Sequence, residues 1–298
     1  MKIEFRYYFF LILAGIFAGV IGVFVKLIGD NVHFLTLMFY RMSFAVLLLI
    51  FIIPLLDKKW YKVTKHDLKG YLLVSIIMTI TFTLFVVANL YAPVQNVVLI
   101  TNIAPFIILI LAYFLLNEKI TKTKIITLCF AIVGIAILNP FNLGENAFGN
   151  YLALGQAVFY SFLIILMRKQ NKEHALGAVL WLFIFSSLIL LPSPFIFGFG
   201  NFEEVWIYII GLGFLSTGLT YLFHNWGLEK VGAEISSIII MLTMPLSGIL
   251  VAYFVLGEDI NLRILIGGVI LIFAGIYLQA HEKKLKSSIR NLSKVMFK

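Results

Sequence analysis

The stretch from residue 94 to residue 140 constrains this chain most, because it recurs 140 positions further along. A proline, the alanine of an Ala-Tyr-Phe triplet, a glutamate and a later leucine all recur at this offset without a gap: Pro105 and Pro245, Ala112 and Ala252, Glu118 and Glu258, Leu138 and Leu278. A repeat of this length indicates that one structural unit has been duplicated. The sequence therefore predicts a first repeat over residues 1–140, a second over 141–282 and a basic tail over 283–298.

Composition places both repeats in a membrane. Hydrophobic residues make up 62% of the 298 residues and charged residues only 12%, with a mean hydropathy of +1.04. A soluble domain carries about 25% charged residues, so no soluble fold of this length hides so much apolar surface. The single cysteine, Cys129, lies in an apolar run, which excludes a disulfide framework and a thiolate metal site.

Ten apolar runs predict ten transmembrane helices, because backbone polar groups in lipid must be satisfied within their own segment. The first run follows Lys2 and Arg6, as in a signal peptide, but it is long enough to span a bilayer and no small-residue cleavage site follows it. We therefore expect an uncleaved first span. The predicted helices are 8–28, 34–56, 68–88, 94–116, 123–139, 151–168, 177–198, 205–224, 234–256 and 262–280.

The basic residues predict the orientation in the membrane. With the N-terminus in the cytoplasm, all but three of the 23 lysines and arginines fall in cytoplasmic loops or termini, the exceptions being Lys26, Arg41 and Arg263. This bias predicts a multi-pass protein of the cell membrane with its N- and C-termini in the cytoplasm. It also accounts for the net charge of +9, so a nucleic-acid partner is excluded.

Each repeat contains five predicted helices, and five is an odd number. The second repeat therefore enters the membrane upside down relative to the first. Inverted repeats of this kind are typical of secondary transporters, whose substrate site lies near the bilayer midplane between the repeats. The predicted fold class is thus an all-α integral membrane protein with ten transmembrane helices, arranged as two inverted five-helix repeats.

Four short motifs, in order along the chain, carry a family resemblance. They are GVIGVFVK at the end of the first helix, FYRMSFAVLLL at the start of the second, and LLNEKIT and VLGEDIN after the fourth and ninth. With these motifs the chain resembles the EamA-type, ten-helix members of the drug/metabolite transporter (DMT) superfamily along essentially its whole length. The resemblance implies a transporter but no particular substrate, since members export or import amino acids, other metabolites, nucleotide-linked sugars or drugs.

Arg41 is the strongest candidate for contact with a substrate. It lies a few residues inside the second apolar run, and a central arginine costs roughly 2.5–3.5 kcal/mol there, so it usually faces a cavity or a partner. A guanidinium can hold a carboxylate through two parallel hydrogen bonds, which suits an amino acid or another organic anion. Two structural alternatives stay open: Arg41 extends to the outer headgroups, or it ties the helix to loop carbonyls.

Two polar stripes on repeat-equivalent helices are candidates for the walls of a central site. Ser75, Thr79 and Thr83 lie on one face of the third helix, and the eighth helix carries a second polar group near its predicted cytoplasmic end. Hydrogen bonds that only join helices are the structural alternative. The predicted substrate-binding residues are Arg41, Thr79, Asn89, Asn102, Gln156, Tyr160, Tyr221, His224, Asn225 and Trp226.

Pro105 and Pro245 are predicted gating positions, because a proline frees a backbone carbonyl and bends a helix. Glu118 and Glu258 follow apolar helices, where a carboxylate is unfavourable to the helix dipole. We expect each glutamate to accept hydrogen bonds from the start of the next helix and so to turn the chain.

Two further features of the first helix receive structural interpretations. Gly15, Gly19 and Gly22 share one of its faces, which predicts close packing against a neighbouring helix. Lys26, near the outer end of the same helix, is interpreted as an interfacial anchor.

Enzymatic, cofactor and metal sites are not predicted. No pair of helical carboxylates suited to magnesium, no HExxH motif and no serine–histidine combination at matching depth occurs in the sequence. None of the 14 acidic residues lies in mid-membrane, which favours facilitated or weakly coupled transport over proton coupling.

The predicted function is a secondary transporter that moves a small polar metabolite, such as an amino acid or related compound, or a drug across the cell membrane by alternating access. The expected partners are a small-molecule substrate and the lipid bilayer, and a homodimer is left open. The alternative is a membrane scaffold or sensor without flux. A scaffold does not need polar residues of both repeats to converge on one place, so their convergence distinguishes the two functions.

Overall fold

A computed structural model describes residues 5–56, 65–116, 122–138, 144, 146–169, 176–231 and 233–277. Within these ranges the chain is helical and contains no strand. Eight helices are long and apolar enough to cross a membrane, and two shorter apolar helices cover residues 125–134 and 262–277. The predicted all-α membrane protein with ten apolar helices is confirmed. The predicted tail and most of the junction between the repeats lie outside the described residues.

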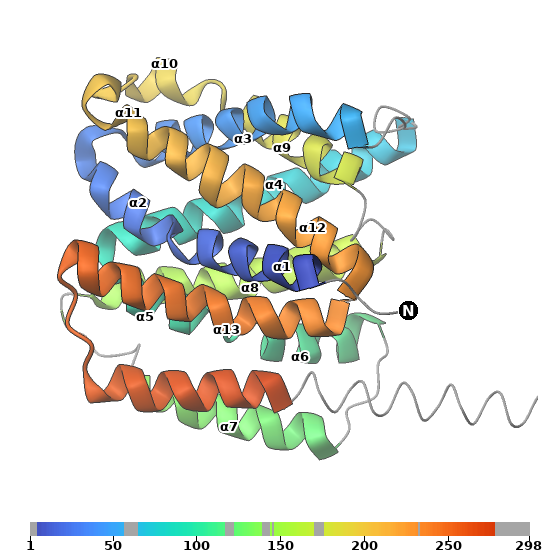
Figure 1. Cartoon of the computed structure of the whole chain (residues 1–298), viewed down its shortest axis with the longest axis vertical. Helices are drawn as coiled ribbons and strands as arrows, with labels where there is room; N and C mark the ends of the chain where they lie inside the picture. Colours follow the sequence, from blue (N-terminus) through green and yellow to red (C-terminus); the bar gives the residue numbers. More distant parts are fainter. Residues whose placement is uncertain are drawn as a thin grey trace, which may run out of the picture.

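The eight long helices and the two shorter ones of the described residues are numbered as spans 1 to 10 along the chain, and Figure 1 shows how they are arranged. In the first half, span 1 is α1 (Phe5–Gly19) and α2 (Ile21–Ile28), followed by the turn η1 (Gly29–Asn31); span 2 is α3 (Phe34–Leu56); span 3 is α4 (Lys65–Tyr91); span 4 is α5 (Val94–Thr101) and α6 (Ala104–Leu116); and span 5 is α7 (Lys122–Leu138).

In the second half, span 6 is α8 (Ala147–Lys169); span 7 is α9 (Leu176–Leu190) and α10 (Ser193–Phe197); span 8 is α11 (Phe202–Ile210), η2 (Gly211–Leu219) and α12 (Thr220–Val231); span 9 is α13 (Ala233–Val251) and η3 (Ala252–Leu256); and span 10 covers residues 262–277. Span 8 is longer at both ends than predicted, and spans 1, 4, 7, 8 and 9 are divided into segments that hydropathy alone does not reveal.

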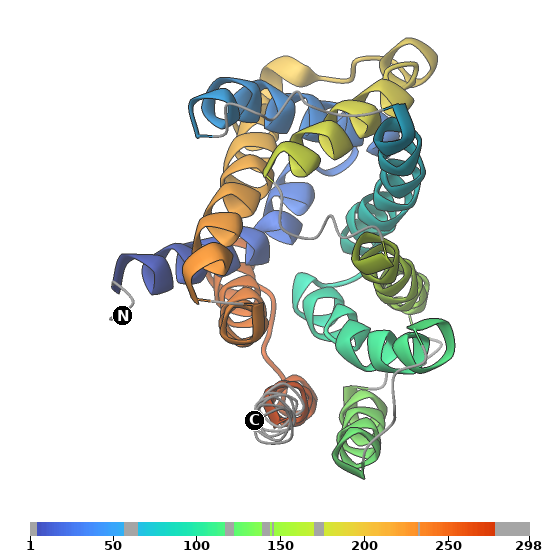
Figure 2. The same cartoon turned by 90° about the vertical axis from the view of Figure 1, so that its right-hand side faces the viewer.

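Each of the main contacts between two spans has a counterpart between the repeat-equivalent spans. Span 1 packs on spans 8 and 9, and its repeat equivalent, span 6, packs on spans 3 and 4. Figure 2 shows these two groups side by side, with α1, α12 and α13 in one and α4, α6 and α8 in the other. Span 2 packs on its own equivalent, span 7, and span 4 on span 9. The contacts therefore follow a pseudo-two-fold relation between the halves.

The second half is inverted relative to the first. The ring of Tyr91 at the end of α4 lies 5.1 Å from the ring of Phe148 at the start of α8, and Leu84 faces Gly155 further along. Spans 3 and 6 are therefore antiparallel. Because spans 1 and 3 cross in the same direction, span 6 begins at the opposite side from span 1, as an odd number of helices per repeat requires.

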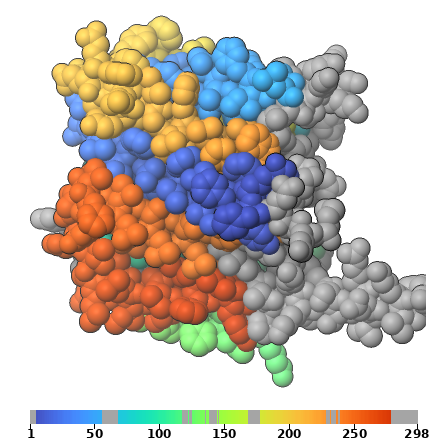
Figure 3. Space-filling view, viewed as in Figure 1, coloured from blue at the N-terminus to red at the C-terminus, as the bar shows by residue number. Residues whose placement is uncertain are grey.

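Close packing of span 1 depends on its glycines. A Cβ on Gly19 would overlap the hydroxyl of Ser247 and the carbonyl oxygen of Met244, both on α13. A Cβ on Gly15 would overlap Thr243 on the same helix. The predicted packing role of this glycine face is confirmed. In Figure 3 the blue surface of span 1 lies between the orange surfaces of spans 8 and 9.

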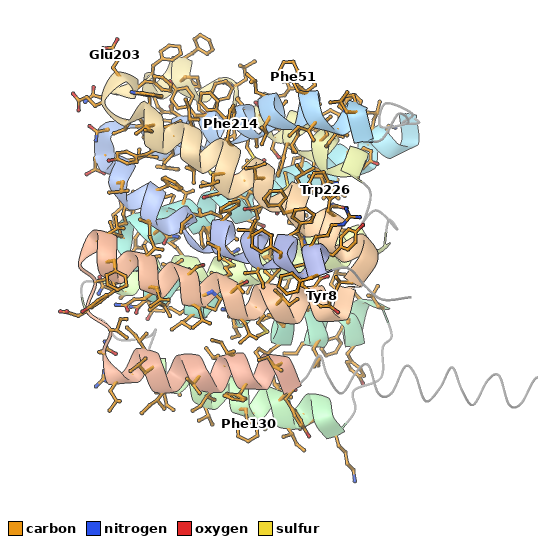
Figure 4. All side chains as sticks on the ribbon, viewed as in Figure 1. Tyr8, Phe51, Phe130, Glu203, Phe214 and Trp226 are labelled. Atoms are coloured by element: carbon orange, nitrogen blue, oxygen red, sulfur yellow. The ribbon has the colours of Figure 1, made fainter. Side chains whose placement is uncertain are left out.

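The outer surface of the bundle is apolar. Phe51 on α3 and Phe130 on α7 are 70% and 54% exposed and project from opposite sides of the bundle in Figure 4. Acidic Glu203, by contrast, lies at one end, in the first turn of α11. Apolar sides with charged ends are the arrangement that a bilayer requires.

Candidate functional site

The guanidinium of Arg41 is buried between the two halves. Arg41 is only 2% exposed, and its Nε donates a hydrogen bond of 2.9 Å to the hydroxyl oxygen of Thr217 on η2. Its Cζ lies 4.9 Å from the centre of the Phe82 ring on α4, an arrangement that attracts a cation to the negative face of the ring. The alternative in which Arg41 extends to the headgroups is therefore wrong.

Aromatic rings surround this guanidinium. The ring of Tyr221 on α12 lies 6.3 Å from Phe82 and 5.1 Å from Phe183 on α9, where the two planes are nearly perpendicular. Tyr221 also lies within electrostatic range of Arg41 and of Tyr160 on α8. We call these side chains the central cluster: Arg41, Phe82, Tyr160, Phe183, Thr217 and Tyr221. Spans 2 and 3 of the first half and spans 6, 7 and 8 of the second all contribute to it.

The local geometry of η2 explains how Thr217 meets Arg41. This segment is π-helical, and the Thr217 hydroxyl donates a 2.8 Å hydrogen bond to the carbonyl of Leu212, five residues earlier. The hydroxyl proton is thus occupied, and the oxygen is free to accept from Arg41. Gly213, whose added Cβ would overlap Phe44, lets η2 approach α3 closely. Short π-helical stretches are rare and are often found at functional sites.

Several polar atoms near the central cluster are buried without a hydrogen-bond partner. Within the described part of the chain they include Nη1 of Arg41, Oγ1 of Thr79 and Oε1 of Gln156. Thr79 is one turn from Phe82 on α4, and Gln156 is one turn from Tyr160 on α8, so both share a face with the cluster. An unsatisfied buried polar group costs about 1–3 kcal/mol and needs an explanation. A bound ligand that pairs with these atoms would supply one.

Four of the other predicted binding residues lie elsewhere or have other contacts. The side-chain nitrogen of Asn89 donates within α4 to the carbonyl of Phe85 at 2.8 Å, and its Oδ1, which faces Gly22 of α2, is buried without a hydrogen-bond partner. The ring of Trp226, labelled in Figure 4, lies 5.5 Å from the ring of Phe10 on α1, so this side chain packs on span 1. His224 is half-buried and has an interaction partner. Asn225 is buried one turn beyond Tyr221.

Asn102 lies where span 4 is interrupted. The chain leaves the α-helix after Thr101 and resumes at Ala104, and the amides of Asn102 and Ile103 donate to carbonyls three residues earlier. The side-chain nitrogen of Asn102 is buried and unpaired. The interruption precedes Pro105, which cannot donate to the carbonyl of Thr101.

The two repeated prolines are not structurally equivalent. Pro105 is the second residue of α6 and follows the interruption in span 4. Pro245 lies inside α13, which continues unbroken from Ala233 to Val251. The repeat in sequence therefore did not predict the difference in helix continuity between spans 4 and 9.

Glu258 caps a helix, but not the one that the sequence suggested. Its two carboxylate oxygens accept hydrogen bonds from the backbone amides of Val94 (2.8 Å) and Gln95 (3.2 Å), at the start of α5 in the other half. The helix that follows Glu258 is capped by Asn261 instead, whose side-chain oxygen accepts from the amide of Ile264. The expectation of a capping role is confirmed, and the choice of the next helix is wrong. Glu118 lies outside the described residues.

Lys26 also lies at this end of the bundle. Its ammonium group donates to the carbonyl of Leu90 at 3.3 Å, and it lies within electrostatic range of Glu258. The carboxylate of Glu258 stabilises the N-terminal end of α5, where the helix dipole is positive. The ammonium group of Lys26 stabilises the C-terminal end of α4, where the dipole is negative. Polar groups here are paired with one another across three spans, which indicates a structural role.

The sequence did not identify three members of the central cluster as site residues. Thr217 belongs to the polar stripe of span 8, but its contact with Arg41 depends on the π-helical geometry. Phe82 and Phe183 are two of 29 phenylalanines, and hydropathy does not separate those that line a site from those that face lipid. No group of three or more histidine, cysteine or acidic side chains suited to a metal ion occurs among the residues that the structure describes.

Ten apolar helices in two inverted halves, with polar side chains of both halves meeting at the centre, define the fold of a membrane transporter. Comparison with known families agrees. The model of the EamA-like transporter family matches residues 5–139 and again residues 147–280. The chain belongs to the EamA-like transporter family, as its resemblance to EamA-type drug/metabolite transporters predicts.

Relatives match the chain over most of their length. An uncharacterized transporter of Archaeoglobus fulgidus is 25% identical over 91% of this chain and 95% of its own length. The S-adenosylmethionine uptake transporter of Rickettsia prowazekii is 26% identical over 88% of both chains. A solved crystal structure with 13% sequence identity covers 94% of this chain and 98% of its own, with a TM-score of 0.66, and so has the same fold.

Proposed function

We propose that the protein is a secondary transporter that binds a small organic substrate at the central cluster and moves it across the cell membrane by alternating access. The observation that carries the proposal is the guanidinium of Arg41, buried between the halves with Nη1 unpaired. A scaffold or sensor has no need for polar side chains of both halves at one place. A transporter needs them, because its substrate must exchange water for protein contacts near the midplane.

The substrate in this proposal is a small polar metabolite, such as an amino acid or a related compound, or a drug. Arg41 would hold a carboxylate, since charge-assisted bonds to a guanidinium are strong and directional. The names of the rickettsial relatives support a metabolite substrate, since S-adenosylmethionine is an amino-acid derivative. Thr79, Gln156 and Tyr160 would contact the rest of the substrate, and Asn225 and His224 would line its path along span 8.

Movement in this proposal is a rocking of the two helix groups in Figure 2 against each other. The interruption at Asn102, with Pro105 beside it, would serve as the hinge of one group, and Pro245 as the corresponding flexible point of the other. Irregular backbone at membrane depth is tolerated where it lines a cavity. Both termini would face the cytoplasm, as the distribution of basic residues predicts.

The test is counterflow into proteoliposomes of purified protein, with a panel of labelled amino acids, organic acids, nucleosides, sugars and organic cations. We expect one class to exchange and excess unlabelled substrate of that class to abolish the signal. Arg41→Ala should remove the exchange, and Ser43→Ala, on the same helix, should keep it. Folded protein that exchanges no compound of the panel would favour the scaffold.

A further inference from the structure

Among the residues that the structure describes, no opposite charge lies beside the positive charge of Arg41. The described side chains around it are aromatic or neutral: Phe82, Tyr221 and Thr217. On span 8 the nearest acidic positions are Glu204 and Glu229, which are 13 and 12 residues from Thr217, or about 18–20 Å along a helix. The acid nearest to span 2 at its start, Asp30, is exposed in η1. A buried cation is normally paired, so the missing partner points to a negatively charged ligand.

The contacts of Arg41 also define which edge of the guanidinium meets that ligand. Thr217 occupies Nε, and the oxygen of Thr217 is itself fixed by the carbonyl of Leu212. The Cζ atom of Arg41 lies over the ring of Phe82, 4.9 Å from its centre. Nη1 is left buried and unpaired. The nitrogens at the end of the side chain are therefore the ones presented to an anion, in a fixed orientation.

We infer that the substrate is an organic anion: a carboxylate on an apolar or aromatic body that carries no ammonium group. This inference rests on the proposed transport function and names the substrate class of the same site. The carboxylate supplies the charge that Arg41 lacks, and the rings of Phe82, Phe183 and Tyr221 receive the body. The unpaired oxygens of Thr79 and Gln156 fit a hydroxyl or carbonyl substituent.

An ammonium group on the substrate would not be balanced in this site. It would add a second positive charge close to Arg41 after the carboxylate had neutralised the first. Neutral oxygens of Gln156 and Tyr160 can accept its hydrogen bonds but cannot cancel its charge. We therefore expect the site to bind a carboxylate more tightly than the amino acid with the same body, and the amino acid more tightly than the corresponding amine.

The first experiment compares substrates that differ only in charge. Each of three bodies, phenyl, indolyl and branched alkyl, is supplied as the propionate, the amino acid and the amine. Counterflow into proteoliposomes is measured against protein-free vesicles, and binding is measured by thermal stabilisation in detergent. In at least one series we expect the propionate to bind at least tenfold more tightly than its amino acid and the amine to be inactive.

The outcomes separate the inference from the function on which it rests. Exchange of amino acids or amines in preference to the matched propionates would overturn the anionic substrate and leave the transporter intact. A folded protein that neither binds nor exchanges any of the nine compounds would overturn both.

The second experiment supplies the missing charge from the protein. Thr217→Asp places a carboxylate where the hydroxyl now accepts from Arg41. We expect propionate binding to fall at least tenfold while the thermal stability of the ligand-free protein is kept or raised. Ser43→Ala is the matched control, since Ser43 lies on the same helix as Arg41 but bonds to Ser187 outside the central cluster, and it should bind like the parent. Undiminished propionate binding by a folded Thr217→Asp protein would overturn the inference.

Discussion

Two charged side chains of this protein, buried Arg41 and half-buried Glu258, have opposite surroundings. Glu258 sits at one end of the bundle with both carboxylate oxygens bonded to backbone amides and a lysine nearby. Arg41 sits between the halves with one bond to a hydroxyl, one aromatic face and an unpaired nitrogen. The comparison teaches that pairing within the protein, rather than burial alone, separates a charge that holds helices together from one that awaits a ligand.

The internal repeat makes the same distinction between Glu258 and Arg41. Glu258 has its counterpart at Glu118, and the segments around both match closely. Arg41 has none, because span 7, the repeat equivalent of span 2, contains no arginine or lysine between residues 176 and 197. The repeat predicts a structural cap in both halves of the pseudo-symmetric bundle, whereas a substrate that is not itself symmetric needs its charged contact only once.

The largest expected effect is on transport and concerns Arg41→Gln. Removal of a charged group that pairs with an opposite charge costs about 2–5 kcal/mol of binding, so we expect exchange to fall about 100-fold or more. Stability should be unchanged or improved, because the variant removes an unbalanced buried charge. Counterflow and thermal unfolding measure the two quantities. A variant that loses stability but keeps transport would reverse the assignment of the two charges.

The next effect concerns Glu258→Gln and should appear in stability. A hydrogen bond to a charged group is worth about 1.5–3 kcal/mol, and the variant keeps only one acceptor for two amides. We expect the free energy of unfolding to fall by about 2 kcal/mol. Titration with a denaturing detergent measures it. The repeat predicts a similar loss for Glu118→Gln. A rise in KM with unchanged stability would instead place Glu258 in the substrate path.

A smaller effect is expected from Thr217→Val, which removes the hydroxyl that orients Arg41. Loss of one hydrogen bond to a charged group, about 1.5 kcal/mol, corresponds to an increase in KM of about tenfold. The maximal rate should change less, since the guanidinium remains. Thr217→Ser should restore the parent KM. Equal loss in both variants would mean that side-chain packing, rather than the hydroxyl, matters at this position.

The smallest effect is expected at a neutral polar pair. The hydroxyls of Ser43 and Ser187 lie 2.7 Å apart and join α3 to α9. Such bonds between transmembrane helices average about 0.6 kcal/mol, so Ser43→Ala should cost about that much stability and leave KM unchanged. Unfolding and counterflow of this variant set the baseline for the three larger effects. A loss of several kcal/mol would show that neutral pairs, too, determine the stability of the bundle.

The sequence predicted the fold more completely than the site, for physical reasons. Hydropathy and the repeat depend on the bilayer and on topology, so the ten apolar helices and the packing role of Gly19 follow directly from them. Which helix Glu258 caps depends on which helix end lies nearby in space, and that end belongs to the other half. Trp226 turns toward Phe10 because it falls on the face of α12 that packs on α1.

The local irregularities of the helices were the hardest features to predict. Proline occurs at equivalent positions in spans 4 and 9, yet only span 4 is interrupted, just before Pro105. No particular amino-acid composition marks the π-helical geometry that places Thr217 opposite Arg41, so the sequence does not predict it. Both features depend on contacts with neighbouring helices, such as the approach of α3 to Gly213, and such contacts are not encoded in a single segment.

The position of span 1 between spans 8 and 9 has a consequence for the biosynthesis of the protein. The first helix enters the membrane early in synthesis, but Phe10 meets Trp226 only after about 200 further residues have been made, roughly 10–40 s later at 5–20 residues per second. Throughout that interval Gly15 and Gly19 lack the residues of α13 against which they pack. The contacts of span 1 with spans 8 and 9 can therefore form only after most of the chain has been made.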